Sequence, residues 1–417
     1  MQDRDLYARI LGLVDPWQVH DVQLDVKGGE VRVTVGAKAT AQWQCPECGK
    51  ACPGYDARQR SWRHLDTCQF KTILVADVPR VECSEHGVLQ VRVPWSEPGS
   101  RFTALKEAVV IAWLRSLASI KAVAEQLRLS WDEVDGIVQR AVARGLLRRQ
   151  RLPVRHLGID ETSFQRRHEY VTVVTDADSG NVLYVADDRK RESLDAFYLA
   201  FPADLRAGIQ VISMDMWPAY IASTREFVAD ADSKIAFDKF HVASHLGKAV
   251  DDVRRAEHKR LLATGDLSLA RTRYLWLSNP ANLDGKDTAS LEALRELNLR
   301  TGRAWVLKET AMDIWRYVRR GHGAQMWRAW IQRAMRSRLE PVKKAARMIR
   351  QHLWGIVNAM ALKASNAISE SINAKIQRIK RTACGFRNRE RFRNAILFHL
   401  GGLDLFPAGA SATHTKV

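Results

Sequence analysis

Three acidic residues of the chain stand where a metal-dependent reaction would need them. Asp160 ends the short apolar run that begins at Leu157, Asp215 ends the apolar run 209–214, and Glu370 lies on a predicted late helix. Carboxylate oxygens suit Mg²⁺ or Mn²⁺, and two such ions can clamp the attacking and leaving oxygens of an in-line phosphoryl displacement. A single Asp at a strand end is more often a turn or cap residue, so the hypothesis depends on the joint pattern.

A mixed sheet of the ribonuclease-H-like type would bring the two aspartates together. The pattern predicts strands over 154–160, 169–175, 182–186, 209–214 and 234–238, with helices over 191–201 and 220–228. In that order the first and fourth strands are neighbours, so their ends meet. Glu161, Asp176 and Asp178 are competing carboxylates. Glu161 would point to the opposite face of its strand, and the two aspartates would lie in a turn.

Four residues near these carboxylates are candidates for supporting roles. Asp238 and His241 follow the fifth strand, where they would contact DNA or organise the metal ligands; alternatively they are a helix N-cap and a half-buried histidine. Trp217 could stack on an unpaired base, although core packing is the commoner role of a tryptophan. Asn373 shares a helical face with Glu370 because it lies three residues further on.

Five of the six cysteines cluster between Cys45 and Cys83. The pair Cys45–Cys48 is a CxxC and the pair Cys83–His86 is a CxxH, and a glycine follows each pair. Together they supply the three sulfurs and one nitrogen of a structural zinc site. Cys52 and Cys68 are rival ligands without such a partner, and two unrelated reduced pairs are the alternative interpretation.

The net charge of +18 and the pI of about 9.9 indicate a polyanionic partner. Nucleic acid is favoured over a membrane surface, and a solvated basic surface is the alternative. No apolar run reaches the length of a membrane span, and the N-terminus lacks the pattern of a signal peptide. We therefore expect a cytoplasmic, nucleoid-associated protein with no membrane partner.

Several segments are predicted to contact double-stranded DNA. Residues 119–127 and the segment from Trp131 onward form two predicted helices with Ser130 as a cap, which resembles a helix-turn-helix, although such pairs also occur without DNA. Arg63 lies in an arginine-rich stretch that would contact phosphates or form a solvated edge strand. The segment from Glu370 to Arg393, both ends included, contains eight basic and two acidic residues. Those predicted to hold a DNA backbone are Lys375, Arg378, Lys380, Arg381 and Arg387.

Taken together, these motifs resemble the ISL-three family of bacterial insertion-sequence transposases, within the DDE class. The matching stretches include the cysteine knuckle, residues 62–66, 158–161, 213–216 and 238–241, the segment Ser365-Asn366-(x₃)-Glu370-(x₂)-Asn373, and residues 380–388. The resemblance implies that Asp160, Asp215 and Glu370 are the catalytic triad, with a helical insertion in the 370 − 215 = 155 residues between the last two. It also implies binding to terminal inverted repeats, strand cleavage and strand transfer. His86 departs from the family pattern, in which a fourth cysteine is expected.

We therefore predict a multidomain α+β and α/β protein. Its predicted parts are a β-rich zinc ribbon (1–100), a helix-turn-helix region (101–152), a ribonuclease-H-like core (153–250), a helical insertion (251–355), the helical end of the core (356–402) and a disordered tail (403–417). Synapsis of two DNA ends would require a homo-oligomer. Two other functions remain open: a DNA-binding regulator with an inactive scaffold, and a structure-specific nuclease of the same fold.

Overall fold

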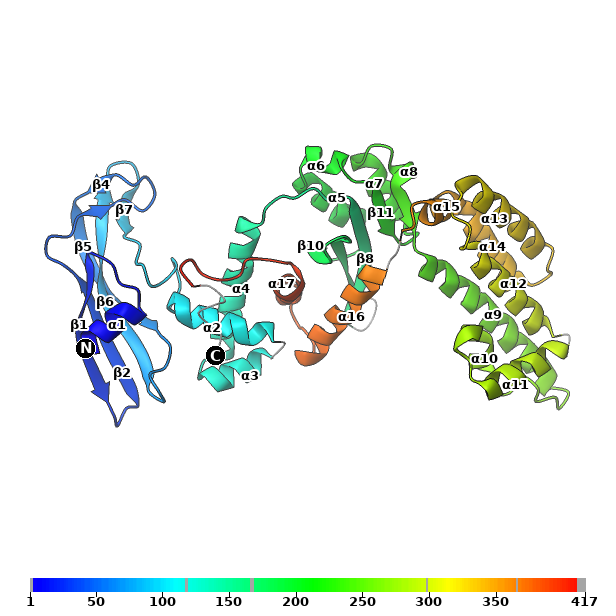
Figure 1. Cartoon of the computed structure of the whole chain (residues 1–417), viewed down its shortest axis with the longest axis horizontal. Coiled ribbons are helices and arrows are strands. Elements are labelled where there is room, and N and C mark those ends of the chain that lie inside the picture. Colours follow the sequence, from blue (N-terminus) through cyan, green and yellow to red (C-terminus); the bar gives the residue numbers. More distant parts are fainter. Residues whose placement is uncertain (1–2, 117–118, 166–168, 298, 365–366, 411–417) are drawn as a thin grey trace. The chain divides into compact units, whose positions relative to one another are not determined.

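The computed structural model describes residues 3–116, 119–165, 169–297, 299–364 and 367–410, and Figure 1 labels its helices and strands. The chain forms two compact units. Unit 1 contains residues 1–150, 382–384 and 403–417, and unit 2 contains residues 151–381 and 385–402. The predicted zinc ribbon and helix-turn-helix therefore belong to one unit, and the predicted core and insertion belong to the other.

Unit 1 begins with a helix that the sequence analysis did not predict, α1 (Asp3–Ile10), followed by a five-stranded sheet. The sheet has the order β1-β2-β6-β5, with β7 also paired to β6; its strands are β1 (Trp17–Asp25), β2 (Glu30–Ala37), β5 (Gly54–Arg63), β6 (Lys71–Cys83) and β7 (Gly87–Gln90). Strands β1 and β2 pair in antiparallel fashion and form a hairpin. Strand β6 is unbroken over its whole length, because buried side chains alternate through Leu74, Ala76 and Val78.

The core of unit 1 is built around three tryptophans. Trp17 and Trp62 both pack edge-on against Trp95, with ring centroids 4.9 and 5.4 Å away. Valines of β2 and β6 fill the space around them. A short two-stranded ladder, β3 (Trp43–Gln44) with β4 (Ala51–Cys52), carries the first cysteine knuckle at the margin of this core.

Three helices complete unit 1: α2 (Ala104–Arg115), α3 (Ile120–Leu127) and α4 (Trp131–Arg148). The predicted turn at 128–130 is confirmed, and Arg128 adopts a left-handed conformation in it (φ +53°). The Ser130 hydroxyl accepts a hydrogen bond from the Glu133 amide, and the Glu133 carboxylate accepts one from the Ser130 amide. This capping box sets where α4 begins.

The segment 403–410 packs on α4, which corrects the prediction of a disordered tail from residue 403. Leu405 is buried, and its carbonyl accepts a hydrogen bond from the buried Arg144. Arg148 donates to the Phe406 carbonyl and pairs with Asp404. Small residues after Pro407 suggested disorder, but Leu405 and these backbone carbonyls satisfy buried groups of α4. Residues 411–417 lie outside the described residues.

Unit 2 contains the predicted mixed sheet, with the order β10-β9-β8-β11-β12. Its strands are β8 (His156–Gln165), β9 (Glu169–Asp176), β10 (Asn181–Ala186), β11 (Val211–Met214) and β12 (Ile235–Phe237). The meander β8-β9-β10 is antiparallel, whereas β11 pairs in parallel with β8 and β12. The ribonuclease-H-like strand order is confirmed. The end predicted for the first strand is wrong, because β9 pairs with β8 as far as Gln165.

Helices surround this sheet and continue into the insertion (Figure 1). In chain order they are α5 (Arg191–Ala200), α6 (Ala203–Ala207), α7 (Pro218–Phe227), α8 (Ala231–Lys234), α9 (Lys239–Leu262), α10 (Arg273–Leu277), η1 (Pro280–Asn282), α11 (Gly285–Glu296), α12 (Arg300–Ile314), α13 (Arg320–Met335), α14 (Glu340–Gln351), α15 (Leu353–Ala361), α16 (Ala367–Thr382) and α17 (Arg389–Leu400). No described helix is long and apolar enough to cross a membrane.

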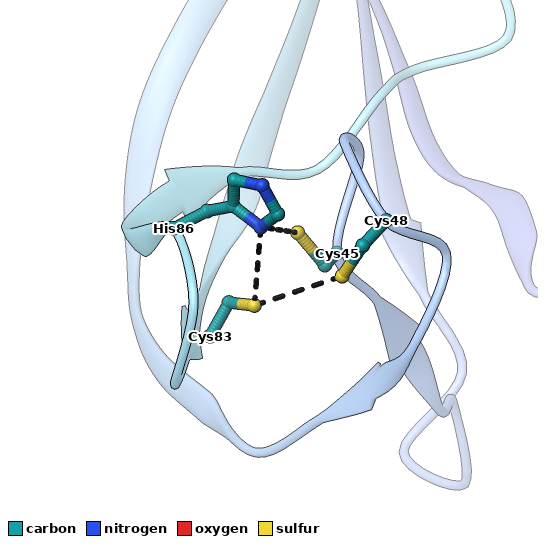
Figure 2. Close-up of side chains that lie close together, drawn as sticks. All are labelled: Cys45, Cys48, Cys83 and His86. Atoms are coloured by element: carbon teal, nitrogen blue, oxygen red, sulfur yellow. Dashed lines mark hydrogen bonds between the residues drawn. The ribbon is translucent and has the colours of Figure 1, made fainter.

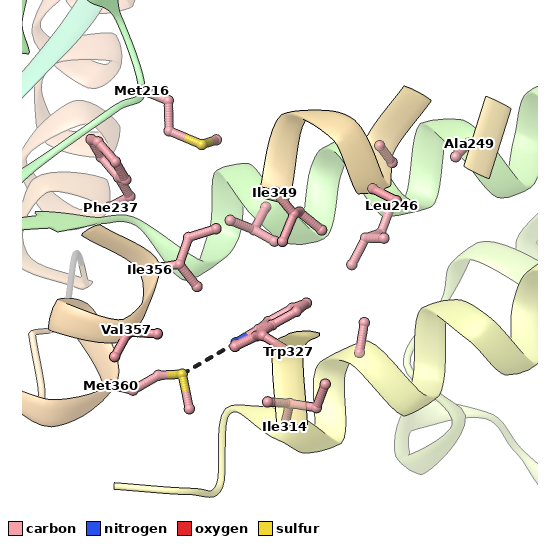
Figure 3. Close-up of a cluster of buried hydrophobic side chains, with 14 of the residues drawn as sticks. Met216, Phe237, Leu246, Ala249, Ile314, Trp327, Ile349, Ile356, Val357 and Met360 are labelled. Carbon is pink, nitrogen blue, oxygen red and sulfur yellow. Dashed lines mark hydrogen bonds between the residues drawn. The ribbon is translucent and has the colours of Figure 1, made fainter. Parts of the chain in front are cut away.

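One continuous hydrophobic core joins the sheet to the insertion. It runs from Leu157 and Phe237 in the sheet to Trp276 and Trp327 in the insertion helices. Figure 3 shows Trp327 beside Ile356 and Met360, and its indole nitrogen donates to the Met360 sulfur at 3.3 Å. Trp276 and Trp327 are therefore core residues, and the packing continues across residue 251.

Candidate active site and zinc-ligand cluster

Asp160 and Asp215 occupy matching positions on two paired strands. The parallel ladder between β8 and β11 ends at the pair Ile159 and Met214. Asp160 and Asp215 are the next residue on each strand, so both carboxylates emerge where the ladder ends. The predicted adjacency of these two aspartates therefore follows directly from the register of the sheet.

Helix α16 runs along β8 beside Asp160. Three of its side chains contact β8 in sequence order: Asn373 donates to Asp160 (2.8 Å), Gln377 donates to Thr162 (3.1 Å) and Lys380 donates to the Ser163 carbonyl (2.9 Å). Glu370 is exposed and lies one turn before Asn373, which puts it on the same face of the helix. Ser365 and Asn366, which begin the segment that matches the family, lie outside the described residues.

Gly158 explains how α16 comes so close to the strand. A Cβ atom at this position would lie 3.0 Å from the Ser369 hydroxyl oxygen and 2.5 Å from the Thr175 hydroxyl oxygen. Only glycine leaves space for both neighbours, so the helix can pack directly on β8. Ser369 immediately precedes Glu370, so this contact fixes the height of Glu370 along the strand.

The Asp160 carboxylate is held by two donors in a partly buried setting. It accepts hydrogen bonds from the Glu161 amide and from Asn373, both at 2.8 Å. Burial raises the pKa of Asp160 to about 6; the Glu161 amide and His241 oppose this rise, and the negative charges of Asp238 and Asp215 add to it. A desolvated carboxylate among other carboxylates is stabilised by a cation, so the donor set fits hard divalent metal ions.

His241 lies between two aspartates. Its Nδ1 is 3.6 Å from the Asp215 carboxylate and its Nε2 is 3.8 Å from the Asp238 carboxylate. Asp238 also caps α9, accepting from the Phe240 amide at 2.9 Å, so the cap role and a place beside the carboxylates are both present. The sequence analysis missed His245, which follows His241 by one helical turn. Burial lowers the pKa of His245, and the negative charge of Asp215 opposes this lowering.

The competing carboxylates point elsewhere. Glu161 faces Arg189, 3.5 Å away, on the opposite side of β8 from Asp160. Asp176 accepts from the Asp178 amide and the Ser179 hydroxyl in the turn before β10. Both predictions about these residues therefore agree with the geometry.

Trp217 is 36% exposed and is not a core residue. Its indole nitrogen donates to the Arg189 carbonyl at 3.0 Å, and the Arg189 guanidinium lies 4.6 Å from the centre of its ring. The same guanidinium lies 5.0 Å from the ring of Tyr170. Core packing, the commoner expectation for Trp217, is therefore wrong, because its neighbour is a surface arginine.

The second candidate site is compact and lies in unit 1. The ligand atoms of Cys45, Cys48, Cys83 and His86 all lie within 4.8 Å of one another (Figure 2). The Cys48 and Cys83 sulfurs are 3.7 Å apart, and His86 Nδ1 lies 3.8 Å from Cys45 and 3.6 Å from Cys83. Zinc–sulfur bonds of about 2.3 Å put tetrahedral sulfurs roughly 3.8 Å apart, so the geometry fits zinc.

Local backbone structure produces this geometry. The glycines after the two knuckles, Gly49 and Gly87, both have left-handed φ values, +72° and +69°. The Gly49 amide donates to the Cys45 carbonyl, which closes the first turn. Amide hydrogen bonds from Glu85, then the His86 ring, lower the pKa of Cys83 to about 6, which favours the thiolate form that binds metal. Cys52 and Cys68 are outside the cluster.

Comparisons with known proteins identify the family of this chain. A family model of an ISL3 transposase domain of the DDE class matches residues 157–396. A model of the zinc finger of transposases IS204/IS1001/IS1096/IS1165 matches residues 41–86. A model of the helix-turn-helix domain of transposase family ISL3 matches residues 91–142. The chain belongs to the ISL3 family of insertion-sequence transposases. The transposase for IS1557 of Mycobacterium tuberculosis (strain ATCC 25618 / H37Rv) is 30% identical, with 96% of each chain covered. The transposase for IS1001 of Bordetella parapertussis is 27% identical over 84% of this chain and 86% of its own.

In this transposase the Arg63 side chain lies inside unit 1 and not on its surface. The Arg63 side chain is 9% exposed, pairs with Asp66 and donates to the His64 and Thr72 carbonyls. Asp66 also contacts Lys106 of α2 and Arg128 of the helix-turn-helix turn. This buried network joins the sheet to the DNA-binding helices and does not fit the predicted phosphate contact of Arg63. The rest of the stretch, 54–61 of β5, is an exposed edge strand.

The other residues predicted to bind DNA differ in their exposure. Trp131, the first residue of α4, is 39% exposed. Four of the basic residues on and after α16 are exposed: Lys375, Arg378, Arg381 and Arg387. Lys380 instead donates a hydrogen bond to the Ser163 carbonyl, and burial lowers the pKa of its side chain. Further along α4, Arg140 and Arg144 pair with the buried Glu107. Arg140 and Arg144 are therefore engaged inside unit 1, whereas Trp131 is exposed at the start of α4.

Proposed function

We propose that this DDE transposase cuts DNA at the ends of its insertion sequence and joins those ends to target DNA through Asp160, Asp215 and Glu370. The observation that carries the assignment is the run of contacts along β8, which sets α16 beside Asp160. The three carboxylates would hold two Mg²⁺ or Mn²⁺ ions. When bound, such ions activate the attacking oxygen and neutralise charge on the leaving oxygen.

The protein side chains would position the reacting groups. Asn373 and the Glu161 amide hold the Asp160 carboxylate in one orientation, and the Met216 amide holds Asp215 at 2.6 Å. Water would attack the phosphodiester bond at the end of the element, which releases a 3′-hydroxyl. That hydroxyl would then attack a phosphodiester of target DNA, one bond forming as one breaks. His241 would restrain Asp215 and Asp238 from one side.

Binding of the DNA ends would involve both units. The N-terminal half of α4, with Trp131 first, would enter the major groove, and the exposed Lys375, Arg378, Arg381 and Arg387 would hold the backbone near the carboxylates. Zinc on the four clustered ligands would stabilise unit 1. Trp217 would stack on an unpaired base. Pairing of two ends would require at least two copies of the chain.

A cleavage and joining assay on DNA carrying the element ends tests this proposal. In Mg²⁺ or Mn²⁺, Asp160→Asn, Asp215→Asn and Glu370→Gln should each lower both reactions by at least about 10³-fold, because each removes a charged ligand. End binding should stay within a few-fold of wild type. Glu390→Gln, an exposed acid on α17, is the matched control and should remain active. Normal joining by Glu370→Gln would exclude that residue from the triad.

A further inference from the structure

A cleft in the helical insertion is separate from both sites described above. It lies between α11, α12 and α13, has a volume of about 990 Å³, and includes none of the candidate metal ligands. Four arginines line it: Arg295 from α11, Arg303 from α12, and Arg333 and Arg336 from α13 and its C-terminal cap. All four are exposed, so their charges face the cleft or its rim.

Two of these arginines are already held in place. The Arg303 guanidinium donates to the Ser337 carbonyl at 2.7 Å, which joins α12 to the end of α13. The Arg295 guanidinium lies 5.1 Å from the centre of the buried Trp305 ring. Fixed guanidinium groups lose less entropy when they bind a second partner, so both are prepared to hold an anion.

The other two arginines carry charge that the protein does not neutralise. Among the described residues, neither the Arg333 nor the Arg336 side chain makes a hydrogen bond or ion pair. The acids that line the cleft, Glu292 and Glu296, both belong to α11, so every charged residue that α12 and α13 contribute to the wall is an arginine. Like charges gathered on one wall repel each other, and a bound anion would relieve that repulsion.

Arginine geometry indicates what the anion is. The planar guanidinium binds phosphate oxygens in pairs, and arginines on three helices can contact phosphates at several positions. The floor between them is apolar, formed by Leu299 and Leu307, both 8% exposed. A sugar-phosphate backbone presents phosphates at intervals with apolar edges between them, which matches a basic wall above an apolar floor.

We propose that this arginine cleft is an additional DNA-backbone site of the transposase, contacting DNA outside the segment read by α4. The inference rests on the proposed function, because it assigns the insertion to the same DNA substrate. It predicts a contact that is independent of base sequence, since phosphates carry no sequence information directly. Removal of the contact should weaken binding to all duplexes and leave the preference for end sequences unchanged.

The test is charge reversal in the full-length protein. Arg333→Glu/Arg336→Glu should weaken affinity for a random-sequence duplex on the order of tenfold at physiological salt, and should lower the slope of log affinity against log salt by about two, one per arginine. The matched control is Arg320→Glu/Arg328→Glu, which makes the same change on exposed positions of α13 outside the cleft. Both variants should melt at the wild-type temperature.

Three outcomes would overturn the proposal. In the first, the cleft variant and its control lose the same affinity and salt slope. In the second, the cleft variant binds DNA like wild type. In the third, inorganic phosphate or pyrophosphate raises the melting temperature of the wild-type protein but not of the cleft variant, and the two proteins bind DNA with equal affinity. That result would show that the cleft binds a free anion and not DNA. Failure of the proposed function is distinguishable, because it would appear as unchanged cleavage in Asp160→Asn.

Discussion

The two candidate metal centres of the transposase are assembled over very different distances in the sequence. Cys45 to Cys48 and Cys83 to His86 each come from one short turn, and their four ligand atoms already lie within 4.8 Å of one another. Asp160, Asp215 and Glu370 come from two strands and a helix, and they do not form such a compact group in the described part of the chain.

This difference follows from what holds each ligand. A knuckle is fixed by its own backbone turn and a left-handed glycine, so it needs no distant partner to aim its sulfurs. A carboxylate at a sheet edge is aimed by neighbours such as Asn373, more than two hundred residues away from Asp160. The zinc site should therefore behave as a stability element, and the carboxylate site should behave as a catalytic element whose geometry depends on the whole of unit 2.

Loss of zinc gives the largest expected effect. Structural zinc contributes on the order of 10 kcal/mol to folding in small zinc domains, so chelation or Cys48→Ser should unfold the region 41–86 and abolish specific end binding. Circular dichroism and measured zinc content would check this. Cys52→Ser and Cys68→Ser are matched controls that should retain zinc. Unchanged circular dichroism and full binding after verified metal removal would contradict the stabilising role.

Loss of the Asn373 amide tests how far the carboxylate site depends on residues that support the ligands. Asn373→Ala removes the 2.8 Å donor to Asp160, and partners of this kind typically affect activity or metal affinity 10- to 100-fold. We expect cleavage to fall by about that factor and to recover partly at higher Mg²⁺. Gln377→Ala, which loses only its contact with Thr162, should stay within a few-fold of wild type. Equal losses in both variants would indicate a general defect of α16.

A single added methyl group at Gly158 should disturb the packing of α16 on β8. Gly158→Ala would place a methyl group 2.5 Å from Thr175 and 3.0 Å from Ser369, which should destabilise unit 2 by about 2 kcal/mol and slow cleavage by moving α16. Gly247→Ala on α9 is the control, because a Cβ there meets nothing within 4 Å. Thermal melting and a cleavage assay give the two readouts. A wild-type melt for Gly158→Ala would show that the helix is not seated as tightly as the distances indicate.

The same contrast explains what the sequence could predict. The zinc ligands follow from spacing alone, and the strand order follows from apolar runs, so both were predictable. The extension of β8 past Asp160 was not, because it depends on pairing with β9. The burial of Arg63 was not predictable either, because Asp66, Lys106 and Arg128 meet only in the folded unit. His245 could have been found, since it follows His241 by four residues on a predicted helix.

The packed tail shows the limit of composition as a guide. Small residues occupy 408–410, which favours disorder, whereas Leu403, Leu405 and Phe406 just before them are large and apolar. Their order comes from α4, where Gly145 leaves space for the chain: a Cβ there would lie 2.7 Å from the Leu403 side chain and 3.3 Å from the Asp404 carbonyl. The apolar residues before Pro407 were therefore the local signal of packing, and only their partner on α4 had to come from the fold.

The smallest effect that we expect is the pH dependence that His64 gives to the stability of unit 1. It tests whether zinc alone stabilises this unit. His64 is 3% exposed and hydrogen-bonds to Thr103, the N-cap of α2, so it joins the sheet to the helices. Burial, and then the charges of Lys106 and Arg63, lower its pKa from 6.5 to about 4, against the opposing charge of Asp66. The unfolded chain therefore binds this proton more tightly than the folded chain.

It follows that stability from His64 is complete above about pH 6.5 and is lost as the pH falls towards 4, at about 1.4 kcal/mol per pH unit. Denaturant unfolding at several pH values would measure this slope. His64→Asn, which keeps a polar group towards Thr103, should show a slope lower by that amount, whereas His20→Asn on exposed β1 should not. Acid release of zinc affects all three proteins alike, so the difference between them isolates His64. Equal slopes would leave the zinc ligands as the source of any acid sensitivity in unit 1.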